Sequence, residues 1–331
     1  MDQMKWIHFA AAYLVLSLLF AWFASIELRR YPMSAIEAAA IYACWLLLLG
    51  FYLAPGFAAP RAWLKAKLRG APATTACVAV FLLPYLLYSA GTGDFHWRAL
   101  GKLFALAAAP LVLFAIAPVR DPKKLNWQDV IVLLWLMVPV LAGVIGGIWT
   151  RPVNLDFMTR VYLVGVGSWS FLILRGTENS GYQFTFSPAI LGDAALNFCG
   201  FAVLAAPLGF ALHFIGWNPQ WRGAQAFLFD YATIFLFVAV TEELFFRGLI
   251  QNLLEGSLAS RYQAQAITSV LFGLSHILHA PFPNWRYVAL ATIAGWFYGS
   301  AYRKRRSLMS SATTHALVDT LWRTFFTIAR T

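Results

Sequence analysis

Charge is scarce in this sequence. Only 12% of its 331 residues are Asp, Glu, Lys or Arg, whereas an average soluble domain carries about 25%. So few charges cannot cover the water-facing surface of a folded chain of this length, which excludes an ordinary soluble globular protein. Disorder is excluded as well, because 60% of the residues are hydrophobic and 17% aromatic, and unfolded segments are poor in both kinds.

Cysteine is equally scarce, and none of the usual cysteine motifs is present. The three cysteines, Cys44, Cys77 and Cys199, lie within apolar runs and show no CxxC spacing. No disulfide framework is therefore implied.

Acidic residues are the rarer charge, so the net charge is +11, from 25 basic and 14 acidic residues. The basic residues occur in short clusters between apolar runs, a placement typical of the cytoplasmic loops of membrane proteins. We therefore expect no nucleic-acid partner. The clusters are Arg61, Lys65, Lys67 and Arg69; Arg120, Lys123 and Lys124; and Arg303–Arg306.

Long apolar runs make up most of the sequence. Because lipid offers no hydrogen-bond partners to the backbone, only helices or closed barrels can span a membrane, and runs of about twenty apolar residues indicate helices. Several runs are short or interrupted by Gly and Pro, so we predict an all-α, polytopic transmembrane helix bundle of about 8–11 spans. The eleven runs are roughly 7–26, 35–54, 72–90, 103–118, 130–149, 159–174, 188–215, 231–254, 264–280, 287–302 and 308–328.

One polar stretch, Arg175–Ser187 (RGTENSGYQFTFS), divides the chain. We predict that residues 1–180 form an N-terminal transmembrane region whose role the sequence does not indicate. Residues 185–331 form a second region, which carries the unusual polar residues.

The most informative run is Tyr231–Leu254, YATIFLFVAVTEELFFRGLIQNLL, which places Glu242, Glu243 and Arg247 among apolar residues. Each charge at mid-membrane costs about 2.5–3.5 kcal/mol on insertion scales. Glu243 and Arg247 stand at i and i+4, acidic residue first, which is the favourable order for an ion pair. Glu242 has no basic residue at i±3 or i±4. An unpaired intramembrane carboxylate indicates a functional site.

Two later runs carry histidine. The segment SVLFGLSH ends in His276, and THALVD places His315 and Asp319 at i and i+4 on one helical face. A single histidine in an apolar helix usually makes an interhelical hydrogen bond. Glu242, His276, His315 and Asp319, however, are all expected at similar depth near the bilayer midplane, from the rise of 1.5 Å per helical residue. This agreement favours one shared polar site within the membrane.

The motifs EELFFR (Glu242–Arg247), FGLSH (Phe272–His276) and HALVD (His315–Asp319) occur in this order on separate runs. They resemble the EExxxR, FxxxH and HxxxN/D signature of the CPBP intramembrane protease family, also called the Abi or CAAX-protease family, which includes the eukaryotic Ras-converting CAAX endopeptidase. The resemblance covers about residues 185–331.

This resemblance implies an intramembrane endopeptidase. Glu242 would be the general base that activates water, and His276 would help to position that water. His315 and Asp319 would complete the catalytic site, and Glu243 with Arg247 would form a supporting ion pair. The substrate would be a peptide or protein at the membrane, with the lipid bilayer as surroundings. We expect a multi-pass integral protein of a bacterial inner membrane.

Two alternatives stay open. Two histidines and one or two carboxylates (Glu242, His276, His315 and Asp319) make a plausible zinc site, but HExxH is absent, and the sequence favours a glutamate mechanism without a metal or other cofactor. A proton-coupled transporter or a peptide-binding membrane protein would also place Glu and His at mid-membrane. The three-part motif favours the protease over this non-catalytic alternative.

Overall fold

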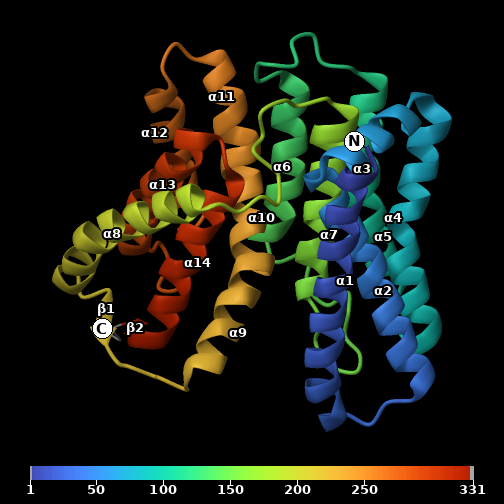
Figure 1. Cartoon of the computed structure of the whole chain (residues 1–331), viewed down its shortest axis with the longest axis horizontal. Coiled ribbons are helices and arrows are strands. Elements are labelled where there is room, and N and C mark those ends of the chain that lie inside the picture. Colours follow the sequence, from blue (N-terminus) through green and yellow to red (C-terminus); the bar gives the residue numbers. More distant parts are fainter. Residues whose placement is uncertain (1, 329–331) are drawn as a thin grey trace. The chain divides into compact units, whose positions relative to one another are not determined.

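The computed structural model describes residues 2–328, which form helices joined by short loops, together with two short strands (Figure 1). Each of the eleven apolar runs contains a helix, so the predicted all-α polytopic bundle is confirmed. Within the described residues, seven helical segments are long and apolar enough to cross a membrane. They are Trp6–Ile26, Ala35–Gly56, Gly70–Thr92, Trp97–Ile116, Phe157–Leu174, Pro188–Ala211 and Ala224–Ser257.

The chain divides into two compact units. Among the described residues, the first unit comprises 2–122 and Asn126–Glu178, and the second comprises Lys123–Leu125 and 179–328. The helices of the first unit are α1 (Asp2–Glu27), η1 (Leu28–Arg30), α2 (Ala35–Leu53), η2 (Ala54–Gly56), α3 (Ala58–Lys67), α4 (Gly70–Thr92), α5 (Trp97–Ile116), α6 (Trp127–Leu141), α7 (Phe157–Ser168) and the π-helical η3 (Trp169–Leu174).

The first unit is a helix bundle in which α2 packs against α4 and α7, and α5 packs against α4 and α6. This bundle contains a fully buried ion pair between Arg175 and Asp129. The guanidinium of Arg175, just after η3, donates from Nη2 to Oδ2 of Asp129 at 2.8 Å, and neither side chain is exposed. Asp129 also caps α6 by accepting from the backbone N–H of Asn126. The polar stretch that begins at Arg175 is thus anchored at its start.

The second unit carries all of the candidate site residues. Its elements are α8 (Pro188–Ala211), β1 (Ile215–Trp217), α9 (Ala224–Ile234), the π-helical η4 (Phe235–Ala239), α10 (Val240–Glu243), the π-helical η5 (Leu244–Gln251), α11 (Asn252–Ser257), α12 (Arg261–Leu274), α13 (Trp285–Arg305), α14 (Leu308–Phe325) and β2 (Phe326–Ile328).

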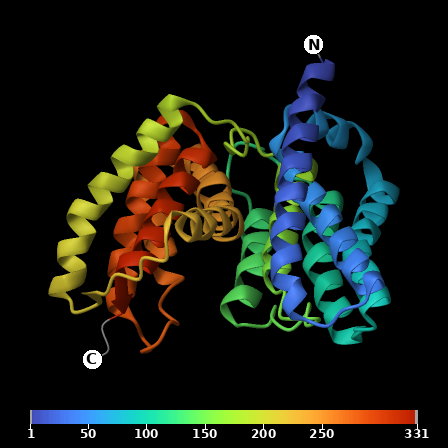
Figure 2. The same ribbon diagram turned by 60° about the horizontal axis from the view of Figure 1, so that its bottom comes forward.

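The segment from α9 to α11 is one continuous helical rod of 34 residues (Figures 1 and 2). At 1.5 Å per residue it is about 50 Å long, more than the hydrocarbon thickness of about 30 Å. The wider π-helical turns η4 and η5 flank α10, which carries Glu242 and Glu243. Such π-bulges often occur at functional sites, because they change the direction in which nearby side chains project.

Helix α14 lies at the centre of the second unit, where it packs against α8, α13 and the α9–η4 segment. Although it lies inside the bundle, it is rich in Ser and Thr. Three of their hydroxyls are satisfied within the helix: Thr314, Thr320 and Thr324 each donate to the backbone carbonyl four residues earlier, at 2.9, 2.6 and 2.7 Å. Because neighbouring helices separate α14 from lipid, it can be less apolar than a lipid-facing span. This explains why the prediction of 8–11 spans exceeds the seven strongly apolar helices.

The two strands join the ends of helices that are distant in sequence. β1, which follows α8, pairs antiparallel with β2, which follows α14, and Gly216 lies opposite Thr327. The strand pair therefore holds the last turn of α14 close to the end of α8.

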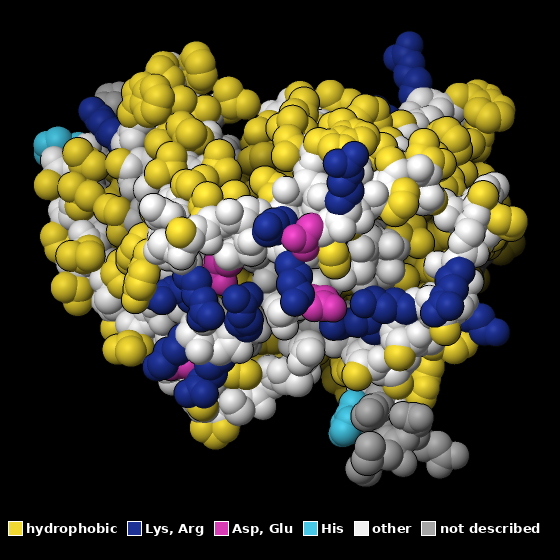
Figure 3. All heavy atoms as spheres, turned by 90° about the horizontal axis from the view of Figure 1, so that it is seen from above, with side chains coloured by type: hydrophobic (Ala, Val, Ile, Leu, Met, Phe, Trp, Pro, Cys, Tyr) yellow, Lys and Arg dark blue, Asp and Glu magenta, His cyan; other side chains and the backbone are white. Residues whose placement is uncertain are grey.

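Lys and Arg side chains lie among apolar ones in the view of Figure 3. In the second unit, the basic cluster Arg303–Arg306 lies at the C-terminal end of α13. Lys304 and Arg305 both bind the carboxylate of Asp193 near the start of α8, and Arg306 binds Glu255 of α11 at 2.8 Å. These ion pairs tie the ends of three helices together at this charged surface.

Candidate active site

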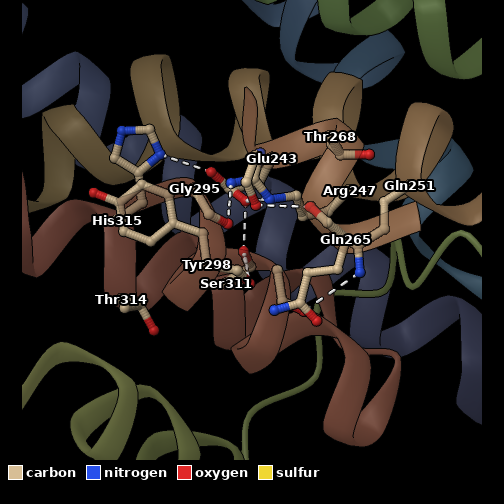
Figure 4. Close-up of polar contacts among 12 residues, drawn as sticks. Glu243, Arg247, Gln251, Gln265, Thr268, Gly295, Tyr298, Ser311, Thr314 and His315 are labelled. Carbon is tan, nitrogen blue, oxygen red and sulfur yellow. Dashed lines mark hydrogen bonds and ion pairs between the residues drawn. The ribbon is translucent and has the colours of Figure 1, made fainter. Parts of the chain in front are cut away.

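The carboxylate of Glu243 is the centre of a buried polar network (Figure 4). Its Oε1 accepts from Nδ1 of His315 at 2.8 Å, its Oε2 accepts from the hydroxyl of Ser311, and Nε of Arg247 lies 3.2 Å from Oε2. The side chains of Glu243 and Arg247 are not exposed at all. A buried charge without a partner is very costly, and these contacts supply the partners.

Arg247 is enclosed by aromatic rings and backbone. Its Nη2 donates to the carbonyl of Gly295 at 3.0 Å, and its guanidinium carbon lies 4.9 Å from the ring centre of Phe272 and 5.6 Å from that of Tyr298. The π faces of these rings attract the cation. Arg247 therefore joins the Glu242–Glu243 helix to α12 and α13.

His315 lies between two carboxylates. Its Nδ1 faces Glu243, and its Nε2 lies 3.4 Å from Oδ2 of Asp319, one helical turn further along α14. Tyr298 stacks on the imidazole, with ring centres 4.5 Å apart and planes inclined by 15°. The ring is thus fixed in position and orientation. Asp319 is the more accessible partner, since 40% of its side chain is exposed while that of Glu243 is buried.

Phe272, the first residue of the FGLSH motif, connects the two histidines. Its ring centre lies 4.9 Å from that of His276 and 5.8 Å from that of His315. The apolar position of this motif is therefore a spacer that touches both imidazoles and the guanidinium of Arg247.

His276 lies in a turn, where the sequence predicted a helical span over 264–280. Helix α12 ends at Leu274, and the chain then turns before α13 begins at Trp285. The Nδ1 of His276 lies 2.8 Å from the carbonyl oxygen of Phe272. Because a carbonyl can only accept, this contact assigns the proton to Nδ1 and leaves the Nε2 lone pair available. The short helix therefore places this imidazole just beyond a helix end.

The side chain of Glu242 differs sharply from that of its neighbour. It is half-buried, and it makes no hydrogen bond or ion pair with any residue in the described part of the chain. Its carboxylate is close enough to interact electrostatically with Arg247, His279, Tyr287 and Tyr298. The oxygen lone pairs of Glu242 are therefore free of partners within the described residues.

Close helix packing holds these residues in register. A Cβ atom on Gly273 of α12 would come within 2.0 Å of Oγ1 of Thr292, and one on Gly295 of α13 within 3.1 Å of the backbone of Ser269. Only glycine allows α12 and α13 to approach this closely. The approach brings Phe272 and the carbonyl of Gly295 against Arg247.

Sequence reasoning missed three residues of this site. Ser311 stands four residues before His315, so its helical spacing offered a signal. Tyr298 and Tyr287 belong to α13, whose run carried no ionisable residue at its centre, and nothing in their spacing distinguished them from packing aromatics. The ring of Tyr287 lies 4.6 Å from His276 and 5.1 Å from His279 between centres.

The arrangement bears on the zinc alternative. In the described residues, no three His, Cys, Asp or Glu side chains are grouped in a way that could hold a metal ion. His276 and His315 each make a hydrogen bond through Nδ1, a pattern that is also usual for metal-bound histidines, so these contacts do not distinguish the two mechanisms. The metal-free glutamate mechanism therefore stays a prediction.

A comparison with protein families matches residues 223–321 to the family described as type II CAAX prenyl endopeptidase Rce1-like. Comparisons with curated proteins and with solved structures gave no match. The matched segment runs from the start of α9 into α14 and includes the EELFFR, FGLSH and HALVD motifs. The family indicates a protease of the CAAX prenyl endopeptidase kind. The resemblance drawn from the three motifs is confirmed: residues 223–321 of this multi-pass membrane protein match the model of the Rce1-like family.

Proposed function

We propose that this protein is an intramembrane endopeptidase in which Glu242 activates the water that hydrolyses a peptide bond of a membrane-associated protein or peptide. The observation that carries the proposal is the contrast between the two adjacent glutamates. Glu243 is fully buried and its oxygens are occupied by Arg247, Ser311 and His315. Glu242 is accessible and its oxygens are free. A general base needs a free lone pair within reach of its water.

The reaction begins when the Glu242 carboxylate takes a proton from water. The water oxygen forms a bond to the scissile carbonyl carbon, and the carbonyl π electrons move to its oxygen. In the second step these electrons return, the C–N bond breaks, and protonated Glu242 gives the proton to the leaving amine. The Nε2 of His276 can accept a hydrogen bond from the same water, because its Nδ1 already donates to Phe272.

His315 contributes on the other side of the site. Glu243 holds its ring through Nδ1, so that Nε2 is directed toward Asp319 and the accessible part of the site. Both ring nitrogens face carboxylates, which can only accept hydrogen bonds, so the ring carries a proton on each nitrogen. The Nε2–H can then stabilise the negative oxygen of the tetrahedral intermediate. Glu243 and Arg247 support the site without touching the substrate.

We assign no metal to this mechanism. The support is the geometry of the side chains, which groups no three candidate ligands among the described residues. Glutamate and histidine then supply the acid–base chemistry directly.

The experiment uses the full chain, purified without a His-tag and reconstituted in liposomes. The substrates are a fluorogenic peptide with a prenylated C-terminal CAAX sequence and the same peptide without the lipid. We expect the wild-type protein to cleave one of them and Glu242→Gln to cleave neither, with unchanged thermal unfolding. Glu37→Gln, which alters a carboxylate of the first unit, is the control and should be fully active.

A Glu242→Gln protein that keeps full activity would contradict the assignment of the base. If the wild-type protein cleaves neither peptide but moves protons across the liposome membrane, and Glu242→Gln stops that movement, the transport alternative is correct.

A further inference from the structure

We propose that Tyr287 is a further catalytic residue, whose hydroxyl donates a hydrogen bond to the negative oxygen of the tetrahedral intermediate. This inference rests on the proposed function and adds a residue that none of the three sequence motifs includes. It follows from the position of the side chain, from its free hydroxyl and from a shortage of other donors.

The position of Tyr287 is central to the site. It lies in the first turn of α13, and its ring centre is 4.6 Å from that of His276 and 5.1 Å from that of His279. It also interacts electrostatically with both Asp319 and Glu242, which come from two different helices. Tyr287 therefore lies beside the imidazoles of His276 and His279.

The hydroxyl of Tyr287 is available. It makes no hydrogen bond to any residue between 2 and 328, and the side chain is partly exposed. Tyr298 interacts electrostatically with the same two carboxylates but is only 1% exposed and stacks on His315. Of these two tyrosines, Tyr287 is the one that a peptide can contact.

The site is otherwise short of donors for an oxyanion. The ionised carboxylate of Asp319 can only accept hydrogen bonds, where an asparagine at the same position could donate. The Nδ1–H of His276 is directed to the carbonyl of Phe272, and that of His315 to Glu243. The Nε2 of His315 supplies one donor, and an oxyanion is usually stabilised by more than one. The phenol of Tyr287 supplies a second.

The surroundings hold Tyr287 firmly. Its backbone N–H donates to Oδ1 of Asn284 at 3.0 Å, and Asn284 in turn binds the carbonyl of Ala280 at 3.1 Å. Phe214 and Trp322 pack against the ring, with centres 5.3 and 6.5 Å away. A donor fixed before the reaction needs little reorganisation when the negative charge develops.

The test is steady-state kinetics in liposomes with whichever CAAX peptide the wild-type protein cleaves. Tyr287→Phe keeps the ring and removes the hydroxyl. We expect its kcat to fall about 100-fold, the usual effect of removing one oxyanion donor, with KM and thermal unfolding unchanged. Tyr262→Phe is the matched control, because Tyr262 lies on α12 against Arg303, outside the site, and it should keep full activity.

A second measurement separates transition-state stabilisation from substrate binding. A peptide analogue whose scissile carbonyl is replaced by CH₂ should inhibit wild-type and Tyr287→Phe proteins equally. If Tyr287→Phe keeps the wild-type kcat while Glu242→Gln is inactive, the role of Tyr287 is overturned and the proposed function stands. A raised KM with unchanged kcat would also overturn it. If the wild-type protein cleaves no peptide, the proposed function and this inference fail together.

Discussion

The Glu243 carboxylate holds Nδ1 of His315 at 2.8 Å across 72 residues of sequence. The same carboxylate lies 3.2 Å from Arg247 on its own helix. One buried group thus links the EELFFR motif to the HALVD motif, and it fixes the orientation of an imidazole. The ion pair of Glu243 and Arg247 is therefore part of the architecture that orients His315, as well as a means of neutralising two charges.

Replacing Arg247 by Met should destabilise the protein by about 3–5 kcal/mol, because it leaves the charge of Glu243 buried without compensation. Thermal unfolding in detergent measures this effect. The double variant Glu243→Gln with Arg247→Met removes both charges and should recover much of the loss. Equal stability of the single and double variants would contradict the ion pair.

The Asp319→Asn protein should keep substantial activity. Glu243 already orients His315, so the contact of Asp319 with Nε2 at 3.4 Å is not needed to fix the ring, and an amide can donate to an oxyanion. His315→Ala, in contrast, should abolish cleavage. Measurement of kcat for both variants checks this, and loss of all activity in Asp319→Asn would show that its negative charge is required.

Chelators should leave cleavage largely intact. In the proposed mechanism the imidazoles act as hydrogen-bond partners, and protein purified without a His-tag should contain no stoichiometric zinc. Elemental analysis before and after treatment with EDTA or 1,10-phenanthroline measures this. One tightly bound zinc per chain, lost together with activity and restored with it, would establish the metal mechanism instead.

The Gly273→Ala substitution should separate α12 from α13. The new methyl group would lie 2.0 Å from Oγ1 of Thr292 and 2.7 Å from the carbonyl of Val288, and such overpacking typically costs about 1–3 kcal/mol. Activity should fall as well, since Phe272 lies in α12 and His276 directly follows this helix. Gly192→Ala on α8 is the control, because nothing lies within 4 Å of its added Cβ. Unchanged unfolding temperature in Gly273→Ala would contradict the close packing.

Much of the fold follows from local sequence. An apolar run of about twenty residues must satisfy its backbone within itself in lipid, so each of the eleven runs contains a helix. The i, i+4 spacing of Glu243 and Arg247 and of His315 and Asp319 brings each pair together on one helix, whatever the rest of the chain does. The three motifs, finally, were enough to predict the family whose model matches residues 223–321.

Only the tertiary structure decided the rest of the site. The different environments of Glu242 and Glu243 depend on which side of the α9–α11 helix faces α14. The π-helical turns on both sides of α10 change the direction in which these side chains project, and a regular period of 3.6 residues does not describe that change. The polar α14 tolerates its hydroxyls because other helices shield it from lipid. Tyr287 and Tyr298 reach the site because glycines let α12 and α13 approach closely. These contacts join residues far apart in sequence, and such contacts depend on packing, which local periodicity does not encode.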